Sequence, residues 1–386
     1  MRYLLIFTLF LAQYVGVGFL TEGLVAIFRD DGMELKKLGL LYFVVIFWSF
    51  RCFWSPFVDK IVSKSGVYKN FIITTQILMI LTLLVVGFLD IRKDTFYIVL
   101  LSFLMGFLSA TNDIASSAFL RKIFKYKNLS FANSVKSGGN LVGHILGAGL
   151  ALMIYDKFGL KASAMFLISL ILVSIFFIVI FDEEKKVLNS DKLNYEVMFV
   201  FLKQEKIWIS VMVFQALGIC MSYGLLTPVL VDSGWDVGYI GKFVHFYGTI
   251  FSLIGAFGIS FIFKKLNQIN GLLLITILMS LVILAMLFPI NGYSFKFVVV
   301  FVVALMSSFF MSNVVILNTI IMSKAKDSPV SQIALQSSIS MLFQFISFYL
   351  GISLASYFGY KFVVILSSFL CLIAFFYILK VRKFIV

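Results

Sequence analysis

Long apolar stretches recur along this chain and are separated by short polar connections. A helix needs about 20 consecutive apolar residues to cross the roughly 30 Å hydrocarbon core of a bilayer. Because that core offers no water to the backbone, the helix is the conformation that suits isolated stretches of this length. The pattern predicts twelve transmembrane helices, at residues 3–27, 39–56, 71–89, 96–120, 130–154, 162–181, 207–230, 238–263, 271–289, 296–322, 330–356 and 361–380.

The composition supports an integral membrane protein. Of the 386 residues, 61% are hydrophobic and only 13% are charged, which is far from the usage of soluble domains. The opening stretch "MRYLLIFTLFLAQYVGVGFL" has some features of a signal peptide. Its apolar region is long and lacks a small-residue cleavage site, so we interpret it as the first transmembrane helix.

The net charge of +14 has two interpretations, a nucleic-acid partner or a membrane topology signal. If both termini are cytoplasmic, most Lys and Arg residues fall in cytoplasmic loops and tails, as the positive-inside rule requires. The charge therefore indicates topology in a bacterial inner membrane and not a nucleic-acid partner. The cysteines, Cys52, Cys220 and Cys371, lack CxxC spacing, so we expect no disulfide framework, metal site or cofactor.

One long polar stretch, residues 182–206, divides the chain into two halves. We predict an N-terminal six-helix bundle at 1–181, a cytoplasmic linker at 182–206 and a C-terminal six-helix bundle at 207–386. An offset of 200 residues aligns "QILM" (76–79) with "TILM" (276–279) and "FGLK" (158–161) with "FGYK" (358–361). Parallel six-helix repeats are typical of major facilitator transporters, whose substrate site lies near the midplane between the halves. The sequence thus predicts an all-α membrane protein with two pseudo-symmetric halves, and a monomer is our default.

Three segments resemble one branch of that superfamily, the AmpG-like permeases, which include muropeptide permeases, acetyl-CoA transporters and RhtX/FptX-like siderophore permeases. The segments are "RCFWSPFVDKIVSKSGVYKNFIITTQ" (51–76), "FLSATNDIAS" (107–116) and "SQIALQSSISML" (331–342). Asn112 stands where the branch usually has Gln, and Ser117 stands where many members have a second Asp. The resemblance implies a secondary transporter for a small molecule.

Asp113 lies in the middle of a long apolar stretch, "SATNDIASSAF". A carboxylate at bilayer depth costs on the order of 3 kcal/mol, so it should face a cavity or a partner. Lys136 is the partner candidate, because both residues lie roughly 9 to 12 Å from the cytoplasmic side at 1.5 Å per residue. Such a pair suits proton coupling. A purely structural ion pair between two helices is the alternative.

Further residues are candidates for a substrate cavity. His144 and His245 have similar estimated depths and suit a proton relay or an anionic solute, although helix–helix hydrogen bonds explain membrane histidines equally well. A cavity that carries Lys136, Lys242 and Arg51 would favour an acidic solute. The repeat pairs Asp113 with Asn313 and Lys136 with Gln336, so the charge is confined to the first half. The predicted cavity residues are Glu22, Trp48, Arg51, His144, Tyr223, Lys242, His245, Asn313 and Gln336.

Asp59 lies in the predicted loop between the second and third helices, "PFVDKIVSKSG". By resemblance to the superfamily motif in this loop, Asp59 would act as a cytoplasmic gate by holding a helix end. An ordinary solvated loop charge is the alternative interpretation.

The predicted function is proton-coupled import of an amphipathic anionic solute, with a ferric siderophore slightly favoured over a muropeptide and with efflux as a further alternative. An enzyme is not expected, because the sequence shows no nucleophile and base arrangement. ATP-driven transport would need a partner, because there is no Walker motif. A sensor would normally carry a soluble signalling domain, and the sequence offers no stretch long enough for one.

Overall fold

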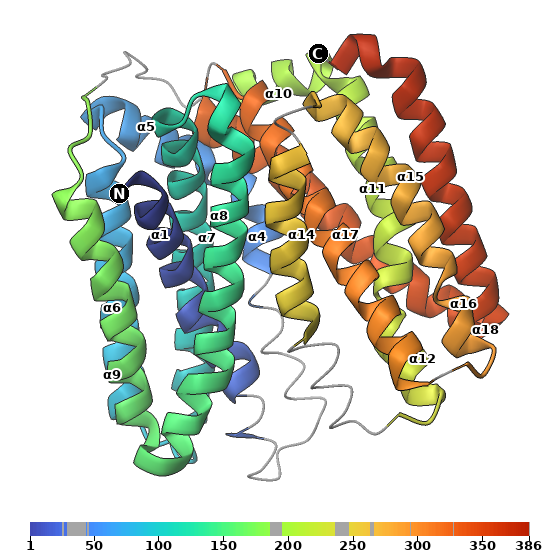
Figure 1. Ribbon diagram of the computed structural model, residues 1–386. Helices are drawn as coiled ribbons and strands as arrows, with labels where there is room; N and C mark the ends of the chain where they lie inside the picture. Colours follow the sequence, from blue (N-terminus) through green and yellow to red (C-terminus); the bar gives the residue numbers. More distant parts are fainter. Residues whose placement is uncertain are drawn as a thin grey trace. The chain divides into compact units, whose positions relative to one another are not determined.

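The computed structural model describes residues 1–24, 27–28, 44, 46–185, 195–235, 247–262, 266–293, 295–326 and 328–385, and every regular element in these ranges is helical (Figure 1). The chain divides into two compact units. Unit 1 comprises Met1–Lys125, Val135–Met198 and Ala325–Ser338. Unit 2 comprises Tyr126–Ser134, Phe199–Lys324 and Ile339–Val386. The domain boundaries expected around the linker stay a prediction.

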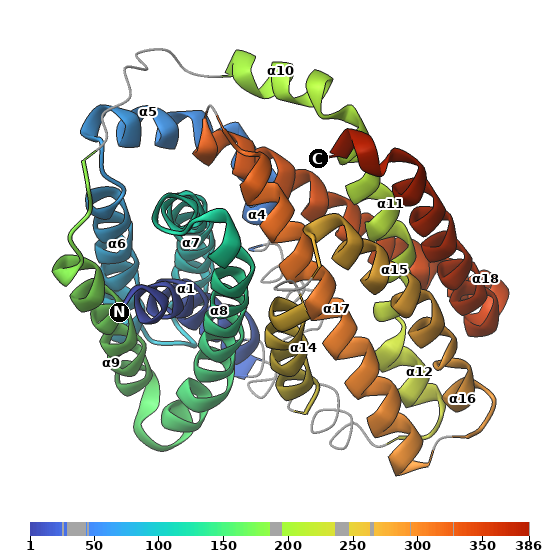
Figure 2. The same cartoon turned by 45° about the horizontal axis from the view of Figure 1, so that its top comes forward.

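Unit 1 holds most of the helices of the first half of the chain. They are α1 (Arg2–Gly18), the π-helix η1 (Phe19–Gly23), α4 (Ile46–Phe50), the 3-10 helix η3 (Arg51–Phe53), α5 (Ser55–Ser65), α6 (Lys69–Phe88), α7 (Thr95–Ile123), α8 (Tyr126–Ile145, from Val135 onward), the π-helix η4 (Leu146–Leu150) and α9 (Ala151–Ile180). α1 packs against α7 and α9, and α6 packs against the same two helices. Figures 1 and 2 show α5 running across one end of these helices.

A row of glycines brings α8 and η4 close to α1. Three glycines, each four residues from the next, face successive backbone carbonyls of α1: Gly139 faces Phe7, Gly143 faces Leu11 and Gly147 faces Val15. A Cβ atom on Gly143 would lie 2.5 Å from the Leu11 carbonyl oxygen. Small residues at this spacing let two membrane helices approach through their backbones. The contact therefore depends on the missing side chains.

Two glycines that the offset of 200 residues pairs have the same backbone conformation. Gly159 interrupts α9 with φ 80° and ψ 179°, and Gly359 interrupts α18 (Pro329–Ile385) with φ 78° and ψ 163°. These conformations are open to glycine and strained for other residues. The two positions are 200 residues apart and belong to "FGLK" and "FGYK". The offset found in the sequence thus reappears as the same backbone break in each unit.

Unit 2 holds most of the helices of the second half. They are α11 (Lys206–Tyr223), α12 (Leu226–Asp232), α14 (Gly248–Ile262), α15 (Gln268–Leu284), α16 (Leu287–Ile290), α17 (Lys296–Lys324) and α18 from Ile339 onward, and α10 (Tyr195–Gln204) begins in unit 1 and ends in unit 2. α17 packs against α14 and α15. The Asn267 side chain accepts a hydrogen bond from the Asn270 N–H at 2.8 Å and so begins α15.

Seven helical stretches of the described residues are long and apolar enough to cross a membrane. They are Lys69–Phe88, Thr95–Ile123, Asn128–Ile180, Lys206–Leu230, Gln268–Ile290, Lys296–Lys324 and Pro329–Lys383. Two shorter apolar helices, Arg2–Gly18 and Gly248–Ile262, accompany them. Two of the seven stretches contain the breaks at Gly159 and Gly359. The expected count of twelve spans stays a prediction.

Candidate functional site

A buried cluster of three charged side chains lies in unit 1. Asp113 of α7 forms an ion pair with Arg51 of η3 through Oδ2 and Nη1, and its Oδ1 lies 3.8 Å from the Nζ atom of Lys136 on α8. The exposed fractions are 4% for Asp113, 6% for Arg51 and 7% for Lys136. Charged residues of these types are rarely buried unless they are paired. We call these three residues the ionic cluster.

Short local contacts hold the three charges in place. Lys136 Nζ donates a hydrogen bond to Ser117 Oγ at 2.8 Å, one helical turn after Asp113 on α7. The same ammonium lies 4.7 Å from the centre of the Phe10 ring of α1. On the other side, Trp54 Nε1 donates to Thr111 Oγ1 at 3.0 Å, which fastens the η3 turn to α7. Helices α1, α7 and α8 and the η3 turn therefore meet at the cluster.

The ionic cluster carries more positive than negative charge. Two cations, Arg51 and Lys136, share the single carboxylate of Asp113. Arg51 Nε has no hydrogen-bond partner among the described residues. A buried charge without full compensation is costly. The arrangement therefore favours the entry of a second anionic group.

Several buried polar side chains on the segments around the cluster have atoms without hydrogen-bond partners among the described residues. Gln13 of α1 lacks partners for both Nε2 and Oε1, and Trp48 of α4 lacks one for Nε1; Ser49 Oγ and Asn112 Nδ2 are also unpaired. Gln13 is fully buried and Trp48 is 3% exposed. Buried polar groups in proteins are almost always hydrogen-bonded. Sequence analysis missed Gln13, although a Gln inside the first apolar stretch, "FLAQYVGV", was a usable signal.

Asp59 of α5 binds the first turn of α18. Its Oδ2 accepts a hydrogen bond from the Ser331 N–H at 2.8 Å, and Asp59 is 5% exposed. A carboxylate at a helix N-terminus is favoured by the unpaired N–H groups and by the helix dipole. Burial raises the pKa of Asp59 from 3.8 to about 6, and the donors at Ser331 and Val330 partly offset this rise. The carboxylate that the resemblance identified as a gate thus contacts a helix end.

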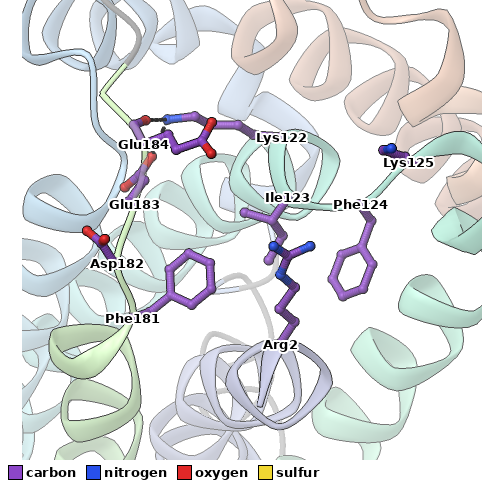
Figure 3. A pocket seen from close by; sticks show the side chains of 9 residues that line it. All are labelled: Arg2, Lys122, Ile123, Phe124, Lys125, Phe181, Asp182, Glu183 and Glu184. Carbon is purple, nitrogen blue, oxygen red and sulfur yellow. Dashed lines mark hydrogen bonds and ion pairs between the residues drawn. The ribbon is translucent and has the colours of Figure 1, made fainter.

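A pocket of about 300 Å³ lies at one end of unit 1, where α7 and α9 end and α1 begins (Figure 3). Glu183 closes one wall, because it accepts hydrogen bonds from the N–H groups of Tyr68 and Lys69 at 3.0 and 2.8 Å. Lys122 Nζ lies 2.7 Å from the same carboxylate. The charged residues that line the pocket include the cations Arg2 and Lys122 and the anions Asp182, Glu183 and Glu184, so both signs of charge lie together. These contacts fasten the chain after α9 to α6 and α7, and they identify no solute.

Among the described residues, no group of three or more His, Cys, Asp or Glu side chains could hold a metal ion. The cysteines Cys52, Cys220 and Cys371 are free thiols.

Most of the chain matches the model of one known protein family. Residues 3–346 match the family model of the Major Facilitator Superfamily. The chain belongs to this superfamily. Solved members have the same fold: the transporter FucP in its outward conformation has a TM-score of 0.74 at 13% identity, over 98% of each chain. A bacterial homologue of the iron transporter ferroportin has a TM-score of 0.72 at 14% identity, over 99% of each chain.

Curated members of the superfamily confirm the resemblance to the AmpG-like branch. The chain is 26% identical over 271 residues to a protein of Rickettsia felis named as the transporter AmpG 4. The aligned region covers 66% of this chain and 65% of that protein. The chain is 23% identical over 257 residues to the anhydromuropeptide permease of Escherichia coli, which covers 64% of this chain and 52% of the permease. The chain thus spans less than two thirds of the length of these relatives. They are permeases and transporters, which confirms the expectation of a transporter-family protein and not an enzyme.

Three predicted residues of this superfamily member lie together in unit 1. Asp113 and Lys136, expected to be neighbours, are 3.8 Å apart, and Arg51 joins them. Trp48 precedes Arg51 by one turn, and His144 follows Lys136 by two turns on α8, where it is half-buried. The roles assigned to these residues stay predictions.

Of the other predicted cavity residues, one lies in α18 of unit 1, two lie in unit 2 and three have side chains outside the described residues. Gln336, buried in α18, donates from Nε2 to the Gln332 carbonyl at 3.0 Å. In unit 2, the Tyr223 ring stacks on Phe310 with centroids 4.1 Å apart, and Asn313 is 5% exposed. The side chain of Glu22 and the residues Lys242 and His245 lie outside the described part of the chain, so the expected pairing of the two histidines stays a prediction.

Proposed function

We propose that this chain is a proton-coupled transporter of the bacterial inner membrane that imports an anionic peptidoglycan fragment, a muropeptide. The observation that carries the proposal is the buried ionic cluster with two cations for one carboxylate. The muropeptide is preferred to the ferric siderophore, because one relative is named as an anhydromuropeptide permease and none of the relatives reported above is named as a siderophore permease. In this proposal the chain has twelve spans, cytoplasmic termini and a monomeric working unit.

The cluster suits an anion because of its charge balance. Arg51 presents donors that match a carboxylate in a two-point contact. Lys136 provides a second cation that already shares Asp113. A solute carboxylate that entered beside these groups would compensate the surplus positive charge. Burial strengthens this attraction, since screening by water is weak there.

Proton coupling follows from competition between Asp113 and the solute. While Asp113 is ionised, it occupies both cations. When Asp113 takes up a proton, its attraction for Arg51 and Lys136 falls, and both cations become available to the solute anion. Proton binding and anion binding therefore reinforce each other, which is the linkage that symport requires. Efflux with the same cluster would need the reverse order of binding and release.

Flux through proteoliposomes tests this proposal. We expect the wild type to accumulate a labelled muropeptide under an inward proton gradient. Asp113→Asn should lose gradient-driven accumulation and keep exchange of labelled for unlabelled solute, because the amide resembles the protonated carboxyl. Glu205→Gln is the matched control, because it removes the charge of another ion pair, with Lys324 in unit 2. It should accumulate solute like the wild type.

Three outcomes would contradict the proposal. If the wild type moves no muropeptide in either direction, the substrate is wrong. If the inward proton gradient drives a muropeptide out of the vesicles and not into them, the protein is an exporter. If Asp113→Asn accumulates the solute as well as the wild type does, the ionic cluster is a structural contact between helices and not a coupling site.

A further inference from the structure

Two buried polar side chains with no hydrogen-bond partner in the part of the chain that the structure describes lie one helical turn from the ionic cluster, and we infer that they form a second recognition subsite for an amide of the solute. This inference rests on the proposed function and extends it to the chemistry of the solute. The residues are Gln13 and Trp48, which we call the amide layer. Their unpaired atoms are one N–H₂ group, one carbonyl oxygen and one indole N–H.

The contacts of α1 place Gln13 next to the cluster. Phe10, whose ring lies beside the Lys136 ammonium, is three residues before Gln13 on the same face of α1. The backbone carbonyl of Gln13 accepts a hydrogen bond from Ser109 Oγ at 3.1 Å. Ser109 is one turn before Asp113 on α7. Gln13 is therefore about one helical turn, roughly 5 Å along the axis, from the level of the Asp113 carboxylate.

The position of Trp48 agrees with that of Gln13. Trp48 is one turn before Arg51 along α4 and η3. Its ring centroid lies 5.9 Å from that of Tyr14, the neighbour of Gln13 on α1. Three chain segments, α1, α4 and α7, thus show the same displacement of one turn between the amide layer and the ionic cluster. Both layers belong to unit 1.

The unpaired atoms specify the chemistry of a ligand. A carboxamide side chain with a free donor and a free acceptor matches an amide, which offers both an acceptor and a donor. The Trp48 N–H adds a donor for a carbonyl or hydroxyl oxygen. A separation of about 5 Å corresponds to an amide one residue away from a carboxylate, since consecutive Cα atoms are about 3.8 Å apart. The solute class is therefore a short peptide or an acylated amino sugar with a carboxylate near the amide.

Gln13→Met tests the amide layer, because it keeps the length of the side chain and removes both polar atoms. The probes are a muropeptide and a set of analogues, each with a different amide replaced by an ester of the same shape. An ester lacks the N–H donor, so Gln13 Oε1 would stay unpaired beside it. For the wild type we expect one analogue to show a KM about tenfold higher than that of the parent, which corresponds to one buried group left unpaired. Gln13→Met should abolish that difference.

Two further variants keep the test decisive. Gln76→Met is the matched control in the same unit, because it removes another fully buried amide, whose Nε2 donates to Ser174 Oγ at 3.0 Å between α6 and α9 and whose Oε1 is unpaired among the described residues. It should leave the discrimination between amide and ester unchanged. Trp48→Phe should raise the KM of the parent and of the ester analogues by the same factor. The indole N–H would donate to a carbonyl oxygen of the solute, and an amide and an ester both keep that oxygen.

The outcomes separate this inference from the proposed function. If the wild type transports the muropeptide but treats every ester analogue like the parent, the amide layer is wrong and the transporter proposal stands. The same conclusion follows if Gln13→Met keeps the discrimination while thermal unfolding shows that it is folded. If the wild type transports no muropeptide, the proposed function itself fails.

Discussion

Removal of the Asp113 charge should destabilise unit 1 strongly, because two buried cations would then face each other without a carboxylate. The distance of 3.8 Å between Lys136 Nζ and Asp113 Oδ1 corresponds to an attraction of about 4 kcal/mol at an effective dielectric constant of about 20. Removing one partner of a buried pair costs about 3–5 kcal/mol. We therefore expect Asp113→Asn to lower the free energy of unfolding by about this amount.

A second substitution should recover part of the loss. Lys136→Met in the Asp113→Asn background removes one of the two uncompensated cations. In a double-mutant cycle we expect a coupling energy of about 2–3 kcal/mol between Asp113 and Lys136. The assay is denaturant unfolding in detergent, followed by tryptophan fluorescence, for the wild type, both single variants and the double variant.

A half-buried ion pair, less buried than the ionic cluster, provides the control cycle. Lys324 and Glu205 in unit 2 are closer, at 2.7 Å, but the Glu205 side chain is 28% exposed. Water screens such a pair, so its coupling energy should stay below about 1 kcal/mol. If the two cycles gave equal coupling energies, burial would not strengthen the ionic cluster, and the reasoning from its surplus charge would be refuted.

Two further predictions concern Asp59 and the glycine row. Because burial raises the pKa of Asp59 from 3.8 to about 6, its contact with α18 should be fully favoured below pH 3.8 and be lost as the pH rises from there through about 6. Alkylation of a cysteine in Ser331→Cys, with the native cysteines replaced, should accelerate over that range by more than thiol ionisation alone explains, and Asp59→Asn should leave only the pH dependence of the thiol itself. Gly143→Ala should cost about 1–3 kcal/mol, because its Cβ would lie 2.5 Å from the Leu11 carbonyl oxygen, whereas Gly149→Ala meets no atom within 4 Å; equal thermal unfolding temperatures for these two variants would contradict the packing argument.

The sequence pattern predicted those features that depend only on the regular spacing of residues along a helix. The proximity of Asp113 and Lys136 followed from helix depth alone, because a straight helix converts residue number into distance. The contact of Arg51 with Asp113 did not follow, because it depends on the 3-10 turn of η3, where helical spacing changes. The partner of Asp59 is 272 residues away in the chain, and only the family resemblance pointed to a helix end there. Gln13 was missed because one amide side chain changes the mean hydropathy of a long apolar stretch very little.

The close contact of α1 with α8 and η4 has a mechanical consequence. Three glycines of one segment face three backbone carbonyls of α1. If the helices slid past each other, these carbonyls would collide with the side chains of the residues between the glycines. Gln13 is carried by one side of this contact and Lys136 by the other. A transporter must change which side of the membrane reaches its substrate. If Gln13 and Lys136 bind the solute as proposed, this helix contact would keep the two side chains at a constant separation while other parts of the molecule move.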